Sequence, residues 1–283
     1  MNNFLEFYQH IPERINPEIF RIGPFSLGWY ALMYLVGFFV VYLLLRYRLK
    51  KNEGQIQLSP EKLFDLLFFC FISAIIGGRL GYVFFYNFPF YLAHLLAIIS
   101  PFDAVTGALV GIYGMSYHGG LVGALIAAGI FVRKYKLNFW TLSDFVVPAI
   151  PAGYFFGRIG NFLNGELYGR ATDGWWGMYF SGDDLGMLRH PSQLYEAILE
   201  GLVLFLIFWF WRKRKSWQGN FLVLYLVGYA TARFLGEFFR EPDAQIGFLF
   251  GGFTLGQLFS LGMFLAGLGM LIIKKRQAGK TML

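Results

Sequence analysis

The sequence predicts an all-α polytopic membrane protein with about seven transmembrane helices and a small periplasmic head insert. Hydrophobic residues make up 57% of the 283 residues and charged residues only 14%, whereas soluble domains carry about 25% charged residues. Apolar runs of about 20 residues, the length that crosses a bilayer, recur along the chain. We therefore interpret residues 1–283 as a single integral membrane domain, with residues 167–192 as a small extracytoplasmic head insert.

Hydropathy places the spans in order along the chain. The predicted spans are about Leu27–Leu45, Leu63–Phe85, Gly119–Val132 with some preceding residues, Phe139–Phe156, Leu194–Trp211, Phe221–Phe239 and Leu255–Ile273. A further apolar piece, Phe90–Ile99, is too short to cross, so we expect it to lie at the interface or to re-enter. Cys70 is the only cysteine, which excludes an internal disulfide and a thiolate metal cluster. No cleaved signal peptide is expected at the N-terminus.

Lysine and arginine positions predict the orientation. Every lysine lies in one of four groups, which seven spans would place on the same membrane face: 46–62, 133–136, 212–215 and 274–280. By the positive-inside rule this face is cytoplasmic, with the N-terminus outside and the C-terminus inside. These loops explain the net charge of +7 without a nucleic-acid partner. The remaining basic residues are all arginines on or near the outer side, which favours anion recognition because arginine binds phosphate with a planar fork.

The segment Gly157–Glu166 is the strongest candidate site. It places Arg158, Asn161, Asn164 and Glu166 at the end of the fourth span. An arginine near hydrocarbon is costly, by about 2.5–3.5 kcal/mol at a helix centre, so such a cluster marks a functional site by default. The glycines among these residues allow the backbone to approach a ligand closely.

A second polar set lies in and after the sixth span. Tyr229, Arg233 and Glu237 are spaced i, i+4 and i+8 and share one helix face, and Arg240 follows on nearly the same face. An intrahelical ion pair between Arg233 and Glu237 that only eases insertion is the alternative. Tyr30 lies near the outer start of the first span, where an ordinary interfacial aromatic residue is the alternative.

Other polar residues also have structural alternatives. His118 precedes the third span, where it is either a functional histidine or a helix cap. Arg79 lies at the end of the second span, where it either contacts a ligand or extends to the lipid headgroups. Glu196 and Glu200 open the fifth span at i and i+4, with a solvated or structural role as the alternative. Asp144 is interpreted as a favourable charge near a helix N-terminus.

Motifs for several enzyme classes are missing from the sequence. It contains no His-Glu-x-x-His zinc pattern, no phosphate-binding P-loop and no Gly-x-Ser-x-Gly elbow. Ser192 lacks an evident base with an orienting partner, so a serine nucleophile is not expected. No metal site and no cofactor are predicted. If the chain is an enzyme, the substrate brings the nucleophile.

The segment Gly157–Gly169 resembles the signature of the prolipoprotein diacylglyceryl transferases. Further blocks resemble that family in the same order along most of the chain: Trp29–Tyr34, Gly77–Tyr82, Met115–Gly120, Arg189–Glu196 and Arg233–Asp243. Several independent blocks in order are far more specific than one motif.

The resemblance implies an enzyme of the bacterial cytoplasmic (inner) membrane with seven helices and an outward N-terminus, active toward the periplasmic side. It implies transfer of the diacylglyceryl group of phosphatidylglycerol to the lipobox cysteine of a prolipoprotein. The products are a thioether and glycerol 1-phosphate. Phosphatidylglycerol, the prolipoprotein signal peptide and membrane lipid are then the partners, and no cofactor is implied.

Roles for the candidate residues follow from this chemistry. A thiol has a pKa of about 8.5, so it needs a base, and His118 is the best candidate. Arg158 and Arg233 are expected to hold the phosphate and stabilise its growing charge. The other candidates are assigned to substrate binding. Asn161 and Glu166 are expected to bind headgroup hydroxyls or to orient the arginines, and Glu237 is expected to fix Arg233. Tyr30 and Tyr229 are expected to hydrogen-bond the lipid head, with Asn164 and Arg240 beside them.

Two other function classes stay open on the residues alone. A lipid or anion transporter also places arginines in a membrane cavity, although it more often shows repeated halves and broken helices at the midplane. A membrane scaffold or receptor has no need of so many polar groups beside hydrocarbon.

Overall fold

The computed structural model describes residues 2–23, 25–86, 88–102, 114–242 and 247–280. The chain forms two compact units, one of residues 1–54 with 143–283 and one of residues 55–142. Both are mostly helical, as predicted, and each is described by itself. The expectation of a single membrane domain stays a prediction.

The first unit begins with short elements that lead into a long helix. These are α1 (Asn2–Gln9), α2 (Ile11–Arg14), β1 (Glu18–Ile22), β2 (Phe25–Gly28), α3 (Trp29–Lys50) and the 3₁₀ turn η1 (Glu53–Gln55). The strands β1 and β2 pair antiparallel, with Arg21 opposite Ser26. This hairpin departs from the predicted all-α class, because two strands of four and five residues carry too little alternation to be recognised.

The second half of the chain supplies the remaining elements of this unit. They are α7 (Phe139–Val146), which starts in the other unit, η3 (Val147–Ala149), α8 (Ile150–Leu163), α9 (Ser192–Glu196), η4 (Ala197–Val203), α10 (Leu204–Trp211), η5 (Lys215–Trp217), α11 (Phe221–Gly236), η6 (Phe250–Gly252) and α12 (Leu255–Lys280). The stretch η4 is π-helical, and α9, η4 and α10 follow one another without a break.

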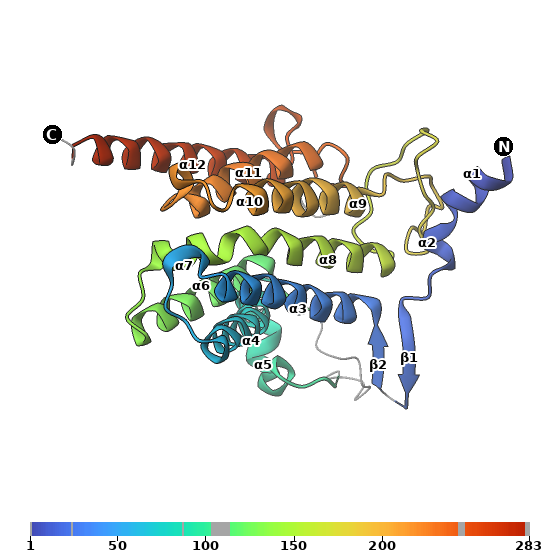
Figure 1. The fold of residues 1–283 in the computed structure, drawn as a ribbon. Coiled ribbons are helices and arrows are strands. Elements are labelled where there is room, and N and C mark those ends of the chain that lie inside the picture. The colour runs from blue at the N-terminus through green and yellow to red at the C-terminus, as the bar shows by residue number, and fades with distance from the viewer. Residues whose placement is uncertain (1, 24, 87, 103–113, 243–246, 281–283) are drawn as a thin grey trace. The chain divides into compact units, whose positions relative to one another are not determined.

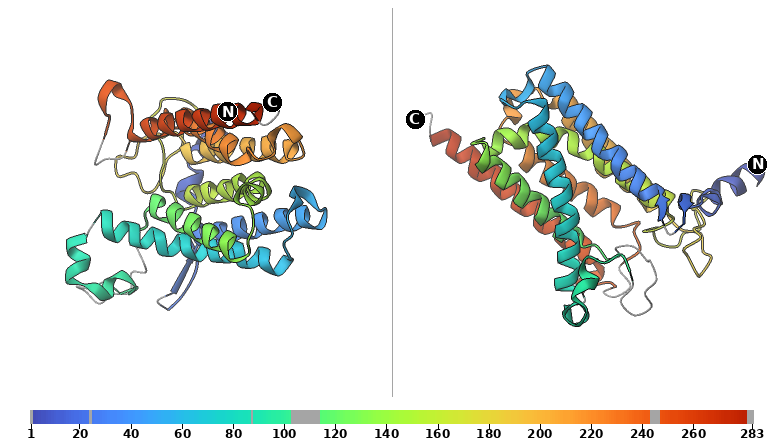
Figure 2. Two further views of the ribbon diagram at one scale, coloured as in Figure 1. Left: turned by 90° about the vertical axis from the view of Figure 1, so that its left-hand side faces the viewer. Right: turned by 90° about the horizontal axis from the view of Figure 1, so that it is seen from below.

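The long helices of the first unit lie side by side. Within it, α3 packs against α8, α8 against α9 and η4, and α11 against α12 and η4 (Figure 1 and Figure 2). Glycines allow the close approaches: a Cβ on Gly37 would lie 3.0 Å from the carbonyl oxygen of Gly153, and one on Gly201 would lie 2.7 Å from Cα of Phe155. Small residues let helix backbones meet closely where both faces are apolar. These contacts hold α3 and η4 against α8.

The predicted head insert is held by backbone bonds rather than by regular elements. The amide of Gly169 donates to the carbonyl of His190 at 2.8 Å, and Met178 and Arg189 exchange two backbone bonds at 2.8 and 2.9 Å. The guanidinium of Arg189 binds both carboxylate oxygens of Asp183, at 2.8 and 2.9 Å. Met178 and Phe180 of the insert also pack with Phe162 of α8 in a small buried cluster, so backbone bonds, an ion pair and apolar packing together hold the insert.

The second unit contains α4 (Pro60–Phe85), α5 (Phe88–Ala93), η2 (Leu95–Ile98) and α6 (Tyr117–Lys134). The predicted short apolar piece therefore forms two short helical turns, α5 and η2. Glycines again set the packing of α4 on α6, since a Cβ on Gly77 would lie 2.4 Å from the carbonyl oxygen of Gly119. Arg79 is buried and donates to the carbonyls of Ile98 and Ala97 at 2.8 and 2.6 Å, so it does not reach for the headgroups.

The helices support a multi-pass membrane protein. Four helices of the described residues are long and apolar enough to cross a bilayer: Trp29–Lys50, Pro60–Phe85, Ser192–Trp211 and Leu255–Arg276. The predicted spans that begin at Gly119 and Phe221 correspond to shorter helices, with 18 residues in α6 and 16 in α11. The predicted span Phe139–Phe156 covers α7, η3 and the first part of α8, which has 14 residues and continues to Leu163. Large apolar side chains such as Phe39, Ile76 and Leu265 stay exposed on the long helices, as expected of surfaces that face lipid.

Candidate active site

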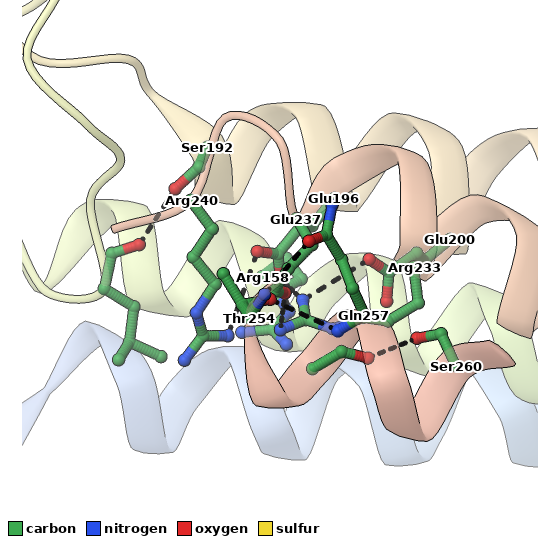
Figure 3. Close-up of polar contacts among 12 residues, drawn as sticks. Arg158, Ser192, Glu196, Glu200, Arg233, Glu237, Arg240, Thr254, Gln257 and Ser260 are labelled. Carbon is green, nitrogen blue, oxygen red and sulfur yellow. Dashed lines mark hydrogen bonds and ion pairs between the residues drawn. The ribbon is translucent and has the colours of Figure 1, made fainter. Parts of the chain in front are cut away.

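A cluster of buried ion pairs joins α8, the α9–η4 helix and α11 in the first unit. Its centre is the carboxylate of Glu196, the last residue of α9 (Figure 3). One oxygen, Oε2, lies 2.9 Å from Nε of Arg158 on α8 and 3.0 Å from a terminal nitrogen of Arg233 on α11. The other oxygen lies 3.9 Å from the guanidinium of Arg240. Three arginines from different parts of the chain therefore converge on one carboxylate.

A second carboxylate lies one turn further along the same helix. Glu200 is fully buried within η4 and lies 3.6 Å from Arg233. The hydroxyl of Tyr154 donates to it, and that hydroxyl in turn accepts from Nε of Arg158 at 2.8 Å. The guanidinium of Arg158 also lies over the Tyr154 ring, 5.0 Å from its centre. Tyr154, held by Glu200, thus contacts the same nitrogen of Arg158, Nε, that lies beside Glu196.

The end of α8 adds a polar chain on the other side of Arg158. A terminal nitrogen of Arg158 donates to Oδ1 of Asn161 at 3.3 Å, and Nδ2 of Asn161 donates to Glu166 at 2.8 Å. The carbonyl of Glu166 accepts from the side-chain amide of Gln193 at 2.6 Å. This chain ties the signature segment to the start of α9.

Arg233 is fixed by a carboxylate of its own segment. Glu237 follows one turn later and lies 2.7 Å from Arg233. Its other oxygen accepts from the hydroxyl of Thr254 at 3.2 Å, just before α12. A Cβ on Gly256 would lie 2.5 Å from the Glu237 carboxylate, so a larger residue there would displace that carboxylate. The intrahelical pair therefore exists, but Arg233 also reaches the glutamates of another helix.

The carboxylates of this network are more deeply buried than its arginines. The side chains of Glu196 and Glu237 are 2% and 6% exposed, whereas those of Arg158 and Arg233 are 15% and 14% exposed. Opposite charges balance one another here, because an unpaired buried charge would cost about 3–5 kcal/mol. The arginines thus keep some open surface while the carboxylates lie behind them.

The structure brings six predicted residues into this one network: Arg158, Asn161, Glu166, Arg233, Glu237 and Arg240. Two more lie against its edges. The ring of Tyr229 meets the ring of Tyr154 edge to face with centres 5.8 Å apart. The backbone of Tyr30 packs against Gly160 of α8, where an added Cβ would lie 3.3 Å from Cα of Tyr30. The hydroxyl of Tyr30 donates to the hydroxyl of Tyr34 at 3.0 Å.

Two predicted residues are described separately from this network. Asn164 is half-buried directly after α8, and in the described part of the chain no side-chain contact joins it to the network. His118 belongs to the second unit, where it is exposed in the first turn of α6. The cap of that helix is Ser116, whose hydroxyl accepts from the amide of Gly119 at 3.3 Å. Asp243, the last residue of one resemblance block, lies outside the described residues.

Sequence reasoning undervalued the two glutamates at the centre. Glu196 and Glu200 carried a structural alternative, and Tyr154 was not singled out at all. Their signal was present, because two carboxylates one turn apart in an apolar span are costly without partners. The partners come from α8 and α11, so spacing along one helix does not reveal them.

Comparisons with known proteins identify the family of this chain. A family model described as prolipoprotein diacylglyceryl transferase matches residues 17–273. The chain is 46% identical to a phosphatidylglycerol–prolipoprotein diacylglyceryl transferase of Chlorobaculum tepidum, over 98% of this chain and 96% of the relative. Proteins with the same name from Bordetella avium and Geobacter sulfurreducens are 44% and 45% identical over 94% and 93% of this chain, and 97% and 96% of their own lengths. The chain belongs to the prolipoprotein diacylglyceryl transferase family.

Proposed function

We propose that this protein transfers the diacylglyceryl group of phosphatidylglycerol to the cysteine thiol of a prolipoprotein. Relatives named for this activity match almost the whole chain at 44–46% identity. The observation that carries the proposal within the molecule is the convergence of Arg158, Arg233 and Arg240 on one buried carboxylate, that of Glu196. Guanidinium groups arranged in this way suit a phosphate ester, which they bind through charge-assisted hydrogen bonds.

The reaction needs no nucleophile from the enzyme. The substrate thiol loses its proton, and the thiolate attacks the glyceryl carbon that carries the phosphate ester. A carbon–sulfur bond forms as the carbon–oxygen bond breaks. The phosphate oxygen leaves with the bonding electrons and a proton is returned to it, which gives the thioether and glycerol 1-phosphate. Arg158 and Arg233 stabilise the charge that grows on the leaving oxygen.

The remaining candidates take supporting roles. His118 is the proposed base for the thiol, on the ground that a histidine changes charge near neutral pH. Asn161 and Glu166 orient Arg158, and Glu237 fixes Arg233, which their contacts support. Tyr30 and Tyr229 are proposed to contact the lipid head. Asn164 and Arg240 complete the binding surface.

The membrane arrangement is also part of the proposal. All seven helices cross the cytoplasmic (inner) membrane, with the N-terminus outside and the C-terminus in the cytoplasm. The lysine-rich loops support this orientation by the positive-inside rule. The arginine site then faces the periplasm, where prolipoproteins emerge from export. The head insert, residues 167–192, lies on that side.

The test is an assay of the purified protein with phosphatidylglycerol and a lipobox peptide. Released glycerol phosphate is counted with the cysteine peptide and with a matched Cys→Ser peptide. We expect release only with cysteine. No release with either peptide, from protein shown to be folded, would favour lipid or anion transport and a translocation path along the arginines.

A further inference from the structure

The carboxylate of Glu196 differs from the other carboxylates of the site in what holds it. Its partners in the described part of the chain are the three guanidinium groups of Arg158, Arg233 and Arg240, at 2.9, 3.0 and 3.9 Å. No hydroxyl or backbone amide of that part donates to it. An anion bound by three arginines and nothing else has the surroundings that a phosphate would need.

Its neighbours are anchored by groups outside the arginine set. Glu200 accepts from the hydroxyl of Tyr154, and Glu237 accepts from the hydroxyl of Thr254 at 3.2 Å. Glu166 accepts from Asn161 at 2.8 Å. These carboxylates keep a partner when an arginine turns away, whereas Glu196 does not.

The contact between Glu196 and Arg233 is close but poorly directed. Oε2 of Glu196 and the terminal nitrogen of Arg233 lie 3.0 Å apart, and both atoms are fully buried. Neither has a hydrogen bond of acceptable geometry to any described residue. Buried polar atoms are normally hydrogen-bonded, and a donor left without a bond costs about 1–3 kcal/mol. The Arg233 donor is therefore available to a better-placed acceptor.

Charge balance adds a third argument. Three arginines face the carboxylates of Glu196, Glu200 and Glu237, so the charges of these six side chains balance one another. A phosphodiester would add a negative charge to a site of low dielectric, where uncompensated charge is costly. For the phosphate to bind tightly, one carboxylate must move away from the arginines.

We propose that Glu196 is an internal stand-in for the substrate phosphate, and that the phosphate of phosphatidylglycerol replaces it on Arg158 and Arg233. Glu196 acts through the arginines and is a positioning residue. It keeps both guanidinium groups aimed at one point while the site is empty, and it competes with the phosphate for them. This inference rests on the proposed function and deepens it.

The experiment compares Glu196→Gln with the wild type, using the purified full-length protein in nanodiscs. The probe is glycerol 1-phosphate, the soluble phosphate product, as a competitive inhibitor. Removing the competing carboxylate is expected to lower its inhibition constant by about tenfold, which corresponds to about 1.4 kcal/mol. The KM for phosphatidylglycerol is expected to fall in parallel. An unchanged or higher inhibition constant would overturn the inference.

Glu53→Gln is the matched control. Glu53 is likewise a buried carboxylate that faces three cations, with Arg212 at 2.8 Å and Arg48 and Lys213 each at 3.3 Å, but it lies outside the network. It is expected to lose stability in the same way while leaving the inhibition constant at the wild-type value. An equal gain in inhibitor binding in this variant would also overturn the inference.

If Glu196→Gln is inactive, its inhibition constant cannot be measured, and thermal unfolding at increasing glycerol 1-phosphate takes the place of that assay. Glycerol 1-phosphate is expected to raise its melting temperature more than that of the wild type, since a ligand that binds only the folded state stabilises it. A smaller rise would contradict the stand-in role. If the wild type shows no turnover, the proposed function is wrong. If the wild type turns over normally and Glu196→Gln binds the inhibitor no better, only this inference is wrong.

Discussion

Arg158→Ala is the substitution that tests the phosphate role most sharply. The change removes the ion pair with Glu196 at 2.9 Å and the hydrogen bonds to Tyr154 and Asn161 at 2.8 and 3.3 Å. In the proposed mechanism it also removes a donor from the place where charge grows on the leaving oxygen. Loss of one such donor in an acyl-transfer enzyme costs about 10²–10³ in kcat, or about 2.7–4 kcal/mol. We expect a loss of that size here.

Arg158→Lys separates charge from geometry. Lysine keeps the positive charge but provides a single point in place of a planar fork, so it cannot reach Tyr154, Asn161 and Glu196 together. We expect its loss to lie between those of the wild type and Arg158→Ala. Lys50→Ala is the control, because Lys50 is exposed at the far end of α3.

The assay is initial-rate release of glycerol phosphate at varied phosphatidylglycerol, on variants that unfold at comparable temperatures. The fall is expected in kcat as well as in kcat/KM, since the contact strengthens in the transition state. Equal losses for Arg158→Ala and Lys50→Ala would refute the phosphate role. A change in KM alone would leave Arg158 as a binding group only.

Three further predictions address other parts of the molecule. His118→Gln is expected to lower kcat by about 10²–10⁴ if histidine is the base, and a near-wild-type rate would remove it from that role. Gly256→Ala pushes a Cβ to 2.5 Å from Glu237 and is expected to cost about tenfold or more in rate, whereas Gly262→Ala meets no atom within 4 Å and should be silent in the same assay. In the head, hydrogen bonds from its arginine partner hold the pKa of Asp183 below its usual value. Because the pKa of Asp183 is lower in the folded than in the unfolded protein, its ionised form stabilises the head. This contribution is fully present above about pH 4, the pKa in the unfolded protein, and disappears as the pH falls through the lower folded pKa. Tryptophan fluorescence of the head should follow that loss, and Asp183→Asn should abolish its pH dependence; an unchanged acid transition would contradict the role of the pair.

The sequence predicted the helices well because apolar composition and length are properties of single segments. Six of the seven predicted spans correspond to one continuous helix each, whereas Phe139–Phe156 is divided among α7, η3 and the first part of α8. The hairpin β1–β2 was missed because its pairing partner is another short segment, and a partner is not visible in local alternation.

The centre of the site was harder to predict for the same reason. Arg158 and Arg233 stood out as costly charges in apolar spans, and that cost is readable from one segment. Glu196 stood out less, because its importance comes from three arginines on other segments. Asp144 shows the same limit: its carboxylate accepts from the amides of Gly219 and Phe221 and so caps the start of α11, not the helix on which it lies.

The central claim is that the arginine cluster holds the phosphate as a leaving group while a thiol attacks carbon. The most direct measurement uses phosphatidylglycerol with oxygen-18 in the bridge between the diacylglyceryl carbon and phosphorus. Mass spectrometry of both products after reaction with the cysteine peptide locates the label. We predict that all of the label leaves with glycerol phosphate and that the peptide gains an unlabelled diacylglyceryl group. Label in a diacylglycerol product, or phosphatidylglycerol consumed without modification of the peptide, would contradict the account.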